Sequence, residues 1–124
     1  MNPIDLRNND LRATTSLADG VLQLALTGTA DASSEVALGG LLTRIQAELL
    51  SHEVHEARVD MRRLEFMNSS CFKAFITWIT VVAHLPPARR HRIRFLCNPA
   101  LHWQRRSLKA MVHFGNDIVT VETG

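Results

Sequence analysis

Two kinds of hydrophobic spacing alternate along this chain of 124 residues. Strict alternation of apolar and polar residues, the period of a strand with one buried face, is clearest over Val21–Thr27. Spacing by three and four, which is typical of an amphipathic helix, is clearest from Ser33 or Ser34 to about Leu50. The pattern therefore predicts strands and helices that alternate within one unit.

The same reading along the whole chain predicts a regular order of elements. The expected strands are Leu11–Ala18, Val21–Thr27, a strand from Ala57 that passes through Leu64 to Phe66 into a turn, His91–Cys97 and Ile118–Val121. Asp19-Gly20 is a strong turn signal and joins the first two strands in a hairpin. Besides the helix ending near Leu50, one helix is expected from Asn68 to Ala83 and another between Pro99 and Gly115.

The order β-β-α-β-α-β-α-β predicts an α/β fold of two layers. We expect a mixed sheet of about five strands with helices mainly on one face, because the strands alternate instead of being apolar throughout. Residues 1–10 are polar and are expected to form a flexible N-terminal segment, and residues 11–124 a single domain. Gly39-Gly40 inside the first helix fits either close packing by another element or a weak helix that tolerates them.

Composition narrows the class of protein. A chain with 46% hydrophobic and 21% charged residues fits a globular domain, and no apolar run approaches the roughly 20 residues of a membrane span. We therefore expect no membrane insertion. Two cysteines, Cys71 and Cys97, and the lack of a secretion signal favour the cytoplasm.

The net charge of +2 conceals an asymmetry. Residues 1–57 hold three basic and eight acidic side chains, a net charge of −5, whereas residues 58–124 hold eleven basic and four acidic ones, a net charge of +7. Such a split raises the question of an acidic protein or nucleic-acid partner. No groove-reading or base-stacking motif accompanies the arginines, so a solvated basic face or an acidic partner is favoured over nucleic acid.

The most informative segment is Asn68-Ser69-Ser70, which follows a strand and begins a helix. Helix N-termini leave backbone N–H groups unpaired and carry a partial positive charge, so they favour Ser or Asn caps and attract phosphate. An ordinary cap at Asn68 or Ser69 explains these residue types by itself. A phosphate-bearing site is the alternative.

At this segment the sequence resembles the STAS family, the sulfate-transporter and anti-sigma-factor-antagonist domain. The family has a strand ending in Asp-Leu and then Phe-Ile/Met-Asp-Ser-Ser/Thr-Gly-Leu at a helix start. Without a gap, this chain has Asp60-Met61 followed by Phe66-Met67-Asn68-Ser69-Ser70-Cys71-Phe72. Leu26 to Asp31 is similar to the family's Leu-Thr-Gly-Glu-Leu/Ile-Asp strand end. Asn68 stands in place of the family's Asp, and Cys71 in place of its Gly.

The resemblance implies a bacterial partner-switching regulator that is not an enzyme, similar to an anti-sigma factor antagonist and acting in transcription control. It implies phosphorylation of Ser69, with Ser70 as the alternative acceptor, by a serine kinase that is also an anti-sigma factor. A phosphatase would reverse the modification, and another signalling enzyme is a further possible partner. The motif positions are Asp60, the cap Asn68 and Cys71.

The helix after Ser69 offers a candidate docking face. At 100° per residue, Phe72, Phe75, Ile76, Ile79 and Ala83 form the main apolar stripe. A second apolar flank consists of Cys71, Ala74, Trp78, Val81 and Leu85. Packing against neighbouring helices is the favoured explanation of this flank, and a partly exposed Trp78 that anchors an interface is the alternative. The candidate partner-binding residues are Asp31, Lys73, Thr77, Trp78 and Val81.

Other kinds of site are less favoured. Neither cysteine begins a phosphatase-type loop, because Thr77 and Trp103 occupy the positions where its arginine would stand. No Gly-rich phosphate loop or catalytic triad is evident, so no cofactor, metal or enzymatic activity is expected. Two alternatives stay open: a STAS subunit of a signalling scaffold or transporter complex that is not phosphorylated, and a small basic nucleic-acid-binding protein.

Overall fold

The computed structural model describes residues 4–52 and 54–123. Its main elements are β1 (Asp5–Asn8), β2 (Leu11–Ala18), β3 (Val21–Ala30), α1 (Glu35–Ser51), β4 (Glu56–Met67), α2 (Ser69–Ala83), β5 (Arg92–Cys97), α3 (His102–Phe114) and β6 (Val119–Thr123). Two short 3-10 turns, η1 (Ala32–Ser34) and η2 (Pro87–Arg89), precede α1 and β5. The predicted alternation of strands and helices after an initial hairpin is confirmed.

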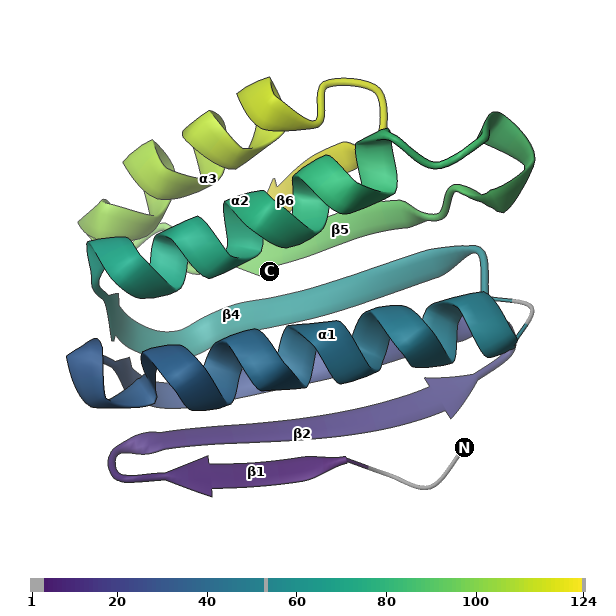
Figure 1. Ribbon diagram of the computed structural model, residues 1–124. Coiled ribbons are helices and arrows are strands. Elements are labelled where there is room, and N and C mark those ends of the chain that lie inside the picture. Colours follow the sequence, from purple (N-terminus) through teal and green to yellow (C-terminus); the bar gives the residue numbers. More distant parts are fainter. Residues whose placement is uncertain (1–3, 53, 124) are drawn as a thin grey trace.

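One mixed sheet contains the described strands in the order β1-β2-β3-β4-β5-β6. The pairs β1–β2 and β2–β3 are antiparallel, and the pairs from β3 to β6 are parallel. Each crossover leads to the next strand in the same direction, so right-handed connections put every helix on the same side. Figure 1 shows α1, α2 and α3 together on one face of the sheet. The predicted two-layer α/β fold is therefore confirmed.

A sixth strand lies where the sequence predicts a flexible segment. Strand β1 pairs with β2 from Asp5↔Thr14 to Asn8↔Leu11, so the prediction is wrong for these residues, while residues 1–3 lie outside the described residues. Next to β1, Ile4 is buried and its backbone N–H donates to the Thr15 hydroxyl at 2.7 Å. This strand exists because β2 offers it a hydrogen-bonding edge, a long-range effect that a short polar segment does not reveal.

Strand β4 passes through Leu64 to Phe66, as the sequence predicts, and continues to Met67 beside β3. The turn expected after Phe66 does not form, because Asn68 follows the strand directly and caps α2. The register shifts twice, from Ala25↔Asp60 to Thr27↔Arg63 and from Gly28↔Leu64 to Thr29↔Phe66, so β4 contains one extra residue at each place. These two bulges break the alternation of the sequence, and Leu64 and Met67 are still buried in the core.

The core lies between the helices and the inner face of the sheet. Phe75 of α2 and Phe95 of β5 are fully buried and meet edge to face, with ring centroids 6.1 Å apart. Leucines and valines from β3 and β4 face α1 and α2 across this layer. The sheet is therefore a rigid support for the helix ends that follow its parallel strands.

The opposite face of the sheet is polar and carries many of the arginines of the basic half. Glu56 accepts a hydrogen bond from the Arg58 guanidinium at 2.8 Å and forms an ion pair with Arg94 at 3.2 Å, and Arg94 also lies 3.4 Å from Glu122. The charge asymmetry of the sequence is thus partly neutralised on this face, away from the helices. None of the helices in the described part of the chain is long and apolar enough to cross a membrane.

Candidate functional site

The site is built where two parallel strands end side by side. The backbone N–H of Asn68, after β4, donates to the carbonyl of Ala30, after β3, at 2.9 Å. The segments that begin α1 and α2 therefore meet at one edge of the sheet, the usual position of functional loops in such folds. Asp31 and Ser69, far apart in the sequence, belong to these two neighbouring segments.

Asn68 is the N-cap residue of α2. Its side-chain oxygen accepts from the backbone N–H of Cys71 at 2.9 Å, and its backbone is extended, with φ −77° and ψ 173°. Ser69 is the first residue of the helix and its side chain is exposed, whereas Ser70 is half-buried. No acidic residue occupies the first turn, so the positive end of the helix faces outward without a compensating charge of its own.

Asp31 caps the neighbouring turn η1. Its carboxylate accepts from the backbone N–H of Ser33 at 2.9 Å and from the Ser33 hydroxyl, and these hydrogen bonds lower the pKa of Asp31. The side-chain amide of Asn9 donates to the same hydroxyl at 2.6 Å. Asp31 is therefore a charged, ordered carboxylate near the start of α2.

Cys71 joins the two segments and is not available for chemistry. Its thiol is fully buried and donates to the backbone carbonyl of Asp31 at 3.4 Å. Burial raises the pKa of the Cys71 thiol, and the negative charges of Glu35 and Asp31 raise it further. The side chain fills space between the two strand ends as a neutral thiol, so a reactive thiolate is not the role of this site.

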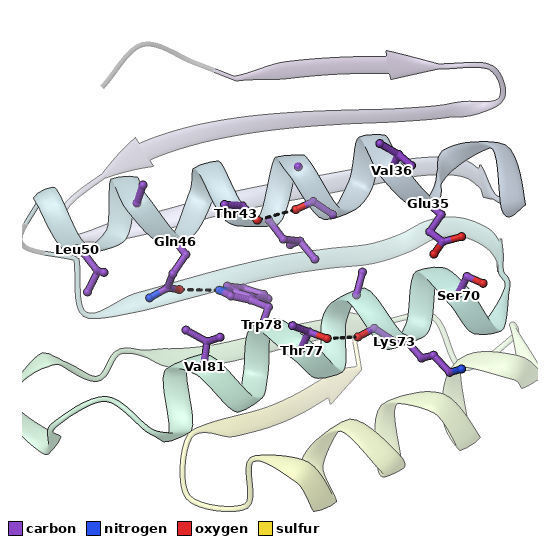
Figure 2. Close-up of a pocket in the computed structure, with 15 residues that line it drawn as sticks. Glu35, Val36, Thr43, Gln46, Leu50, Ser70, Lys73, Thr77, Trp78 and Val81 are labelled. Atoms are coloured by element: carbon purple, nitrogen blue, oxygen red, sulfur yellow. Dashed lines mark hydrogen bonds between the residues drawn. The ribbon is translucent and has the colours of Figure 1, made fainter.

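A groove of about 750 Å³ runs between α1 and α2, from the start of α2 toward its end. The predicted partner-binding residues Lys73, Thr77, Trp78 and Val81 all line it, together with Ser70. Figure 2 shows these α2 side chains opposite Gln46 and Leu50 of α1. The structure therefore brings most of the predicted docking residues onto one surface, which we call the α1–α2 groove.

Trp78 lies in the floor of the groove. Its side chain is only 4% exposed, and its indole N–H donates to the side-chain oxygen of Gln46 at 2.7 Å. Of the two readings open for Trp78, packing against a neighbouring helix is therefore the one that the structure shows, and a partly exposed anchor is not. On the rim, Lys73 and Val81 are exposed, and Val81 has 47% of its surface free.

The helical-wheel prediction for α2 is rotated with respect to the structure. Cys71 and Trp78, assigned to a secondary flank, are buried, while Phe72 and Ile76, assigned to the main stripe, are only half-buried. The reason is that α2 packs on two neighbours at once, the sheet beneath it and α1 beside it. A pattern of apolar positions cannot tell which of two adjacent apolar arcs faces which neighbour.

Asp60 does not belong to this surface. It lies within β4 on the polar face of the sheet, where Arg62 binds it through two side-chain hydrogen bonds of 3.0 and 2.8 Å. These hydrogen bonds, together with the nearby positive charges, hold the pKa of Asp60 below its ordinary value. Asp60 therefore orders the strand before the site instead of contacting Ser69.

Two groups of groove residues were not predicted from the sequence. Gln46 forms the floor with Trp78, and Gly39-Gly40 leaves the wall of α1 bare, since a Cβ atom at either glycine would meet nothing within 4 Å. The glycines are thus not explained by close packing within the chain. A signal for them was present, because two glycines in an otherwise well-patterned helix are costly.

Comparison with solved structures shows the same fold in two signalling systems. An anti-sigma factor antagonist from Mycobacterium paratuberculosis is similar with a TM-score of 0.64 and 16% sequence identity, over 87% of this chain and 86% of that chain. A chain from the crystal structure of the diguanylate cyclase SiaD in complex with its activator SiaC, from Pseudomonas aeruginosa, has a TM-score of 0.70 and 12% identity. That match covers 98% of this chain and 99% of the other. No family model and no curated protein matches the sequence. The STAS-type fold that the sequence predicted is confirmed.

Proposed function

We propose that this chain is a bacterial partner-switching regulator, similar to an anti-sigma factor antagonist, that works by binding and not by catalysis. In this proposal it binds a signalling protein through the α1–α2 groove and the adjoining start of α2. Reversible phosphorylation of Ser69 controls that binding. The observation that carries the proposal is the exposed Ser69 hydroxyl at the capped, positive end of α2, next to a groove lined by the candidate docking residues.

The position suits a phosphate for physical reasons. The unpaired N–H groups in the first turn of α2 and the positive end of its dipole stabilise negative charge. Lys73 stands four residues after Ser69 on the same side of the helix, within reach of a phosphate. A phosphoserine carries a charge of about −1.5 to −2 at neutral pH, so the helix would accept it without unfolding.

The same charge would act against a bound partner. Asp31 and Glu35 already make this edge of the groove acidic on the α1 side. A phosphate would add to that charge and draw Lys73 away from any acidic group of the partner. The switch would then work through the interface, by repulsion and by the cost of desolvating a dianion, instead of through the fold.

The two solved relatives suggest the kind of partner. One is an anti-sigma factor antagonist, and the other comes from a complex in which SiaC is the activator of the diguanylate cyclase SiaD. For this chain we expect either a serine kinase that serves as an anti-sigma factor or another signalling enzyme, with a phosphatase to reset Ser69. The kinase would supply ATP and Mg²⁺.

Intact-mass measurement and co-purification from native cells test the proposal together. We expect a phosphate on Ser69, or on Ser70, in some growth conditions, and a partner that is retained by Ser69→Ala and lost by Ser69→Asp. Thr120→Asp is the matched control, because Thr120 is exposed on β6 far from α2 along the chain. A partner bound equally by Ser69→Asp and wild type, with no phosphate in any condition, would support a purely structural subunit instead.

A further inference from the structure

We propose that the α1–α2 groove receives one amphipathic α-helix of the partner protein, about four turns long, with a side-chain oxygen at its centre and an acidic residue near one end. This inference rests on the proposed function and specifies the partner of that same surface. It is carried by the spacing of exposed residues on α1 and α2, by the two glycines and by an unsatisfied amide in the groove floor.

The exposed residues of both helices follow the repeat of a coiled coil. On α1 the groove is lined at spacings of four and three by Val36, Gly40, Thr43, Ala47 and Leu50, and on α2 by Ser70, Ala74, Thr77 and Val81. Repeats averaging 3.5 residues are the pattern by which one helix packs along another. Val36 is 87% exposed and Leu50 39%, so no element in the described part of the chain covers this seam.

The direction of the two helices makes the seam continuous. Both helices follow parallel strands of one sheet, so they run side by side in the same direction, as Figure 1 shows. A third helix laid between them would contact both seams at once. Fourteen residues separate Val36 from Leu50, which at 1.5 Å per residue is a length of about 21 Å, or four turns.

The two glycines of α1 would suit contact with a helix of the partner, and packing among the described residues does not explain them. Gly39 and Gly40 line the groove, and apart from the neighbouring backbone of α1 none of the residues that the structure describes lies within 4 Å of where their Cβ atoms would be. Each glycine weakens α1 relative to alanine. Small residues allow two helix backbones to approach closely, so an external helix is the contact that would offset this cost.

Gln46 supplies an independent sign of an occupant. Gln46 is only 8% exposed. Its side-chain oxygen accepts from the Trp78 indole N–H at 2.7 Å, which fixes the orientation of the amide. The amide nitrogen then has no acceptor among the described residues. In Figure 2 this nitrogen points into the space between Leu50 and Val81. A buried donor without a partner is unfavourable, and a side-chain oxygen on the incoming helix would satisfy it once Leu50 and Val81 move apart.

The charge of Lys73 indicates where one end of the partner helix would lie. Lys73 is exposed on the rim beside Ser70, and it forms no ion pair with the residues that the structure describes. An acidic residue of the partner near this end would pair with Lys73. The phosphate proposed for Ser69 would compete for the same lysine, which links occupancy of the groove to the switch.

The test uses a phage-displayed library of helix-forming peptides, about four turns long, randomised along one face and selected on the wild-type chain. We expect the enriched peptides to carry apolar residues three and four apart with a central Asn, Gln, Asp or Glu. A synthetic binder should become helical on binding, and its amide chemical-shift changes should map to α1 and α2. Replacing its central oxygen-bearing residue by leucine should weaken binding at least threefold.

Matched variants of the chain separate docking from folding. Gly40→Arg and Ala47→Arg should weaken binding of the peptide at least tenfold. Ser51→Arg, at an exposed position of α1 that does not line the groove, should leave the affinity within twofold. Gly40→Arg replaces a glycine by a good helix former at an open position, so it should fold at least as well as wild type. The same affinity for Gly40→Arg and wild type would overturn the inference.

Other occupants would appear as distinct results, each of which contradicts the proposal. Shift changes at the seam that grow with concentration in the chain alone would identify a second copy as the occupant. Recovery of extended, proline-containing peptides would identify a strand or coil.

The two proposals can fail separately. If helical peptides do not bind but Ser69→Asp releases the native partner, only this inference fails. If they bind the groove but Ser69→Asp releases neither peptide nor partner, the switching proposal fails.

Discussion

Replacing Ser69 by aspartate should stabilise the fold while it weakens partner binding. The carboxylate would stand at the first position of α2, where no acidic residue occupies the first turn. Interaction with the helix dipole is worth about 0.3–1 kcal/mol at such a position. Lys73, four residues later, adds about 0.2–0.5 kcal/mol as an ion pair on the helix surface.

Two nearby carboxylates oppose this gain. Asp31 and Glu35 lie close enough to the start of α2 to raise the pKa of the Cys71 thiol, so they would also repel the new charge. With this repulsion subtracted, we expect a net gain of about 0.5–1 kcal/mol in the free energy of unfolding. For a domain of this size that corresponds to a rise of about 2–5 °C in Tm.

Urea denaturation followed by circular dichroism measures this gain, with the slope m expected to stay constant. Ser69→Asn, which has the shape without the charge, is the control and should show no gain. The gain should also disappear near 1 M salt, where the Debye length is only about 3 Å. A loss of more than about 1 kcal/mol in Ser69→Asp would refute the reasoning, because phosphorylation would then act by disrupting α2 and not by changing an interface.

Four further substitutions test other positions of the fold. Gly28→Ala should destabilise the fold by at least about 2 kcal/mol in urea titration, because Gly28 has φ +97° and a Cβ there would lie 1.9 Å from the Asp10 carbonyl oxygen. Gly40→Ala, with open space around it, should instead stabilise by about 0.5–1 kcal/mol; equal effects of the two substitutions would contradict this explanation. Trp78→Phe should cost about 1–3 kcal/mol because the buried oxygen of Gln46 loses its donor, and an unchanged urea midpoint would show that this hydrogen bond contributes nothing. Burial lowers the pKa of His91 from 6.5 to about 4. As the pH falls, His91 therefore binds a proton in the unfolded chain near pH 6.5, but in the folded chain only near pH 4. Between these two values the free energy of unfolding should fall by about 1.4 kcal/mol per pH unit. His91→Leu should remove this part of the slope in urea midpoints measured against pH, and an unchanged slope would mean that His91 does not cause it.

Local sequence signals account for the elements near the site. The Asp19-Gly20 turn, both residues of which have positive φ, joins β2 and β3 as predicted. Asn68 accepts from the backbone N–H of Cys71 and begins α2, and its side chain needs only residues three positions away to do so. Such features depend on interactions within a few residues, so the order of strands and helices could be read from the chain alone.

Contacts between distant residues decided what the chain alone did not show. Strand β1 depends on the edge of β2, the two extra residues in β4 depend on the register with β3, and the burial of Trp78 depends on Gln46 of α1. The alternation of β5 predicted one exposed face, but only the sheet order brought Arg94 beside Glu56.

The sequence by itself therefore determined the kinds of element, their order, the cap of α2 and the resemblance that points to Ser69. Only the tertiary structure decided which apolar arc of α2 faces α1, and that Gly39-Gly40 lines an open groove. The physical reason is that hydrophobic periodicity records which residues avoid water, whereas the neighbour that covers them is chosen by packing across the whole fold.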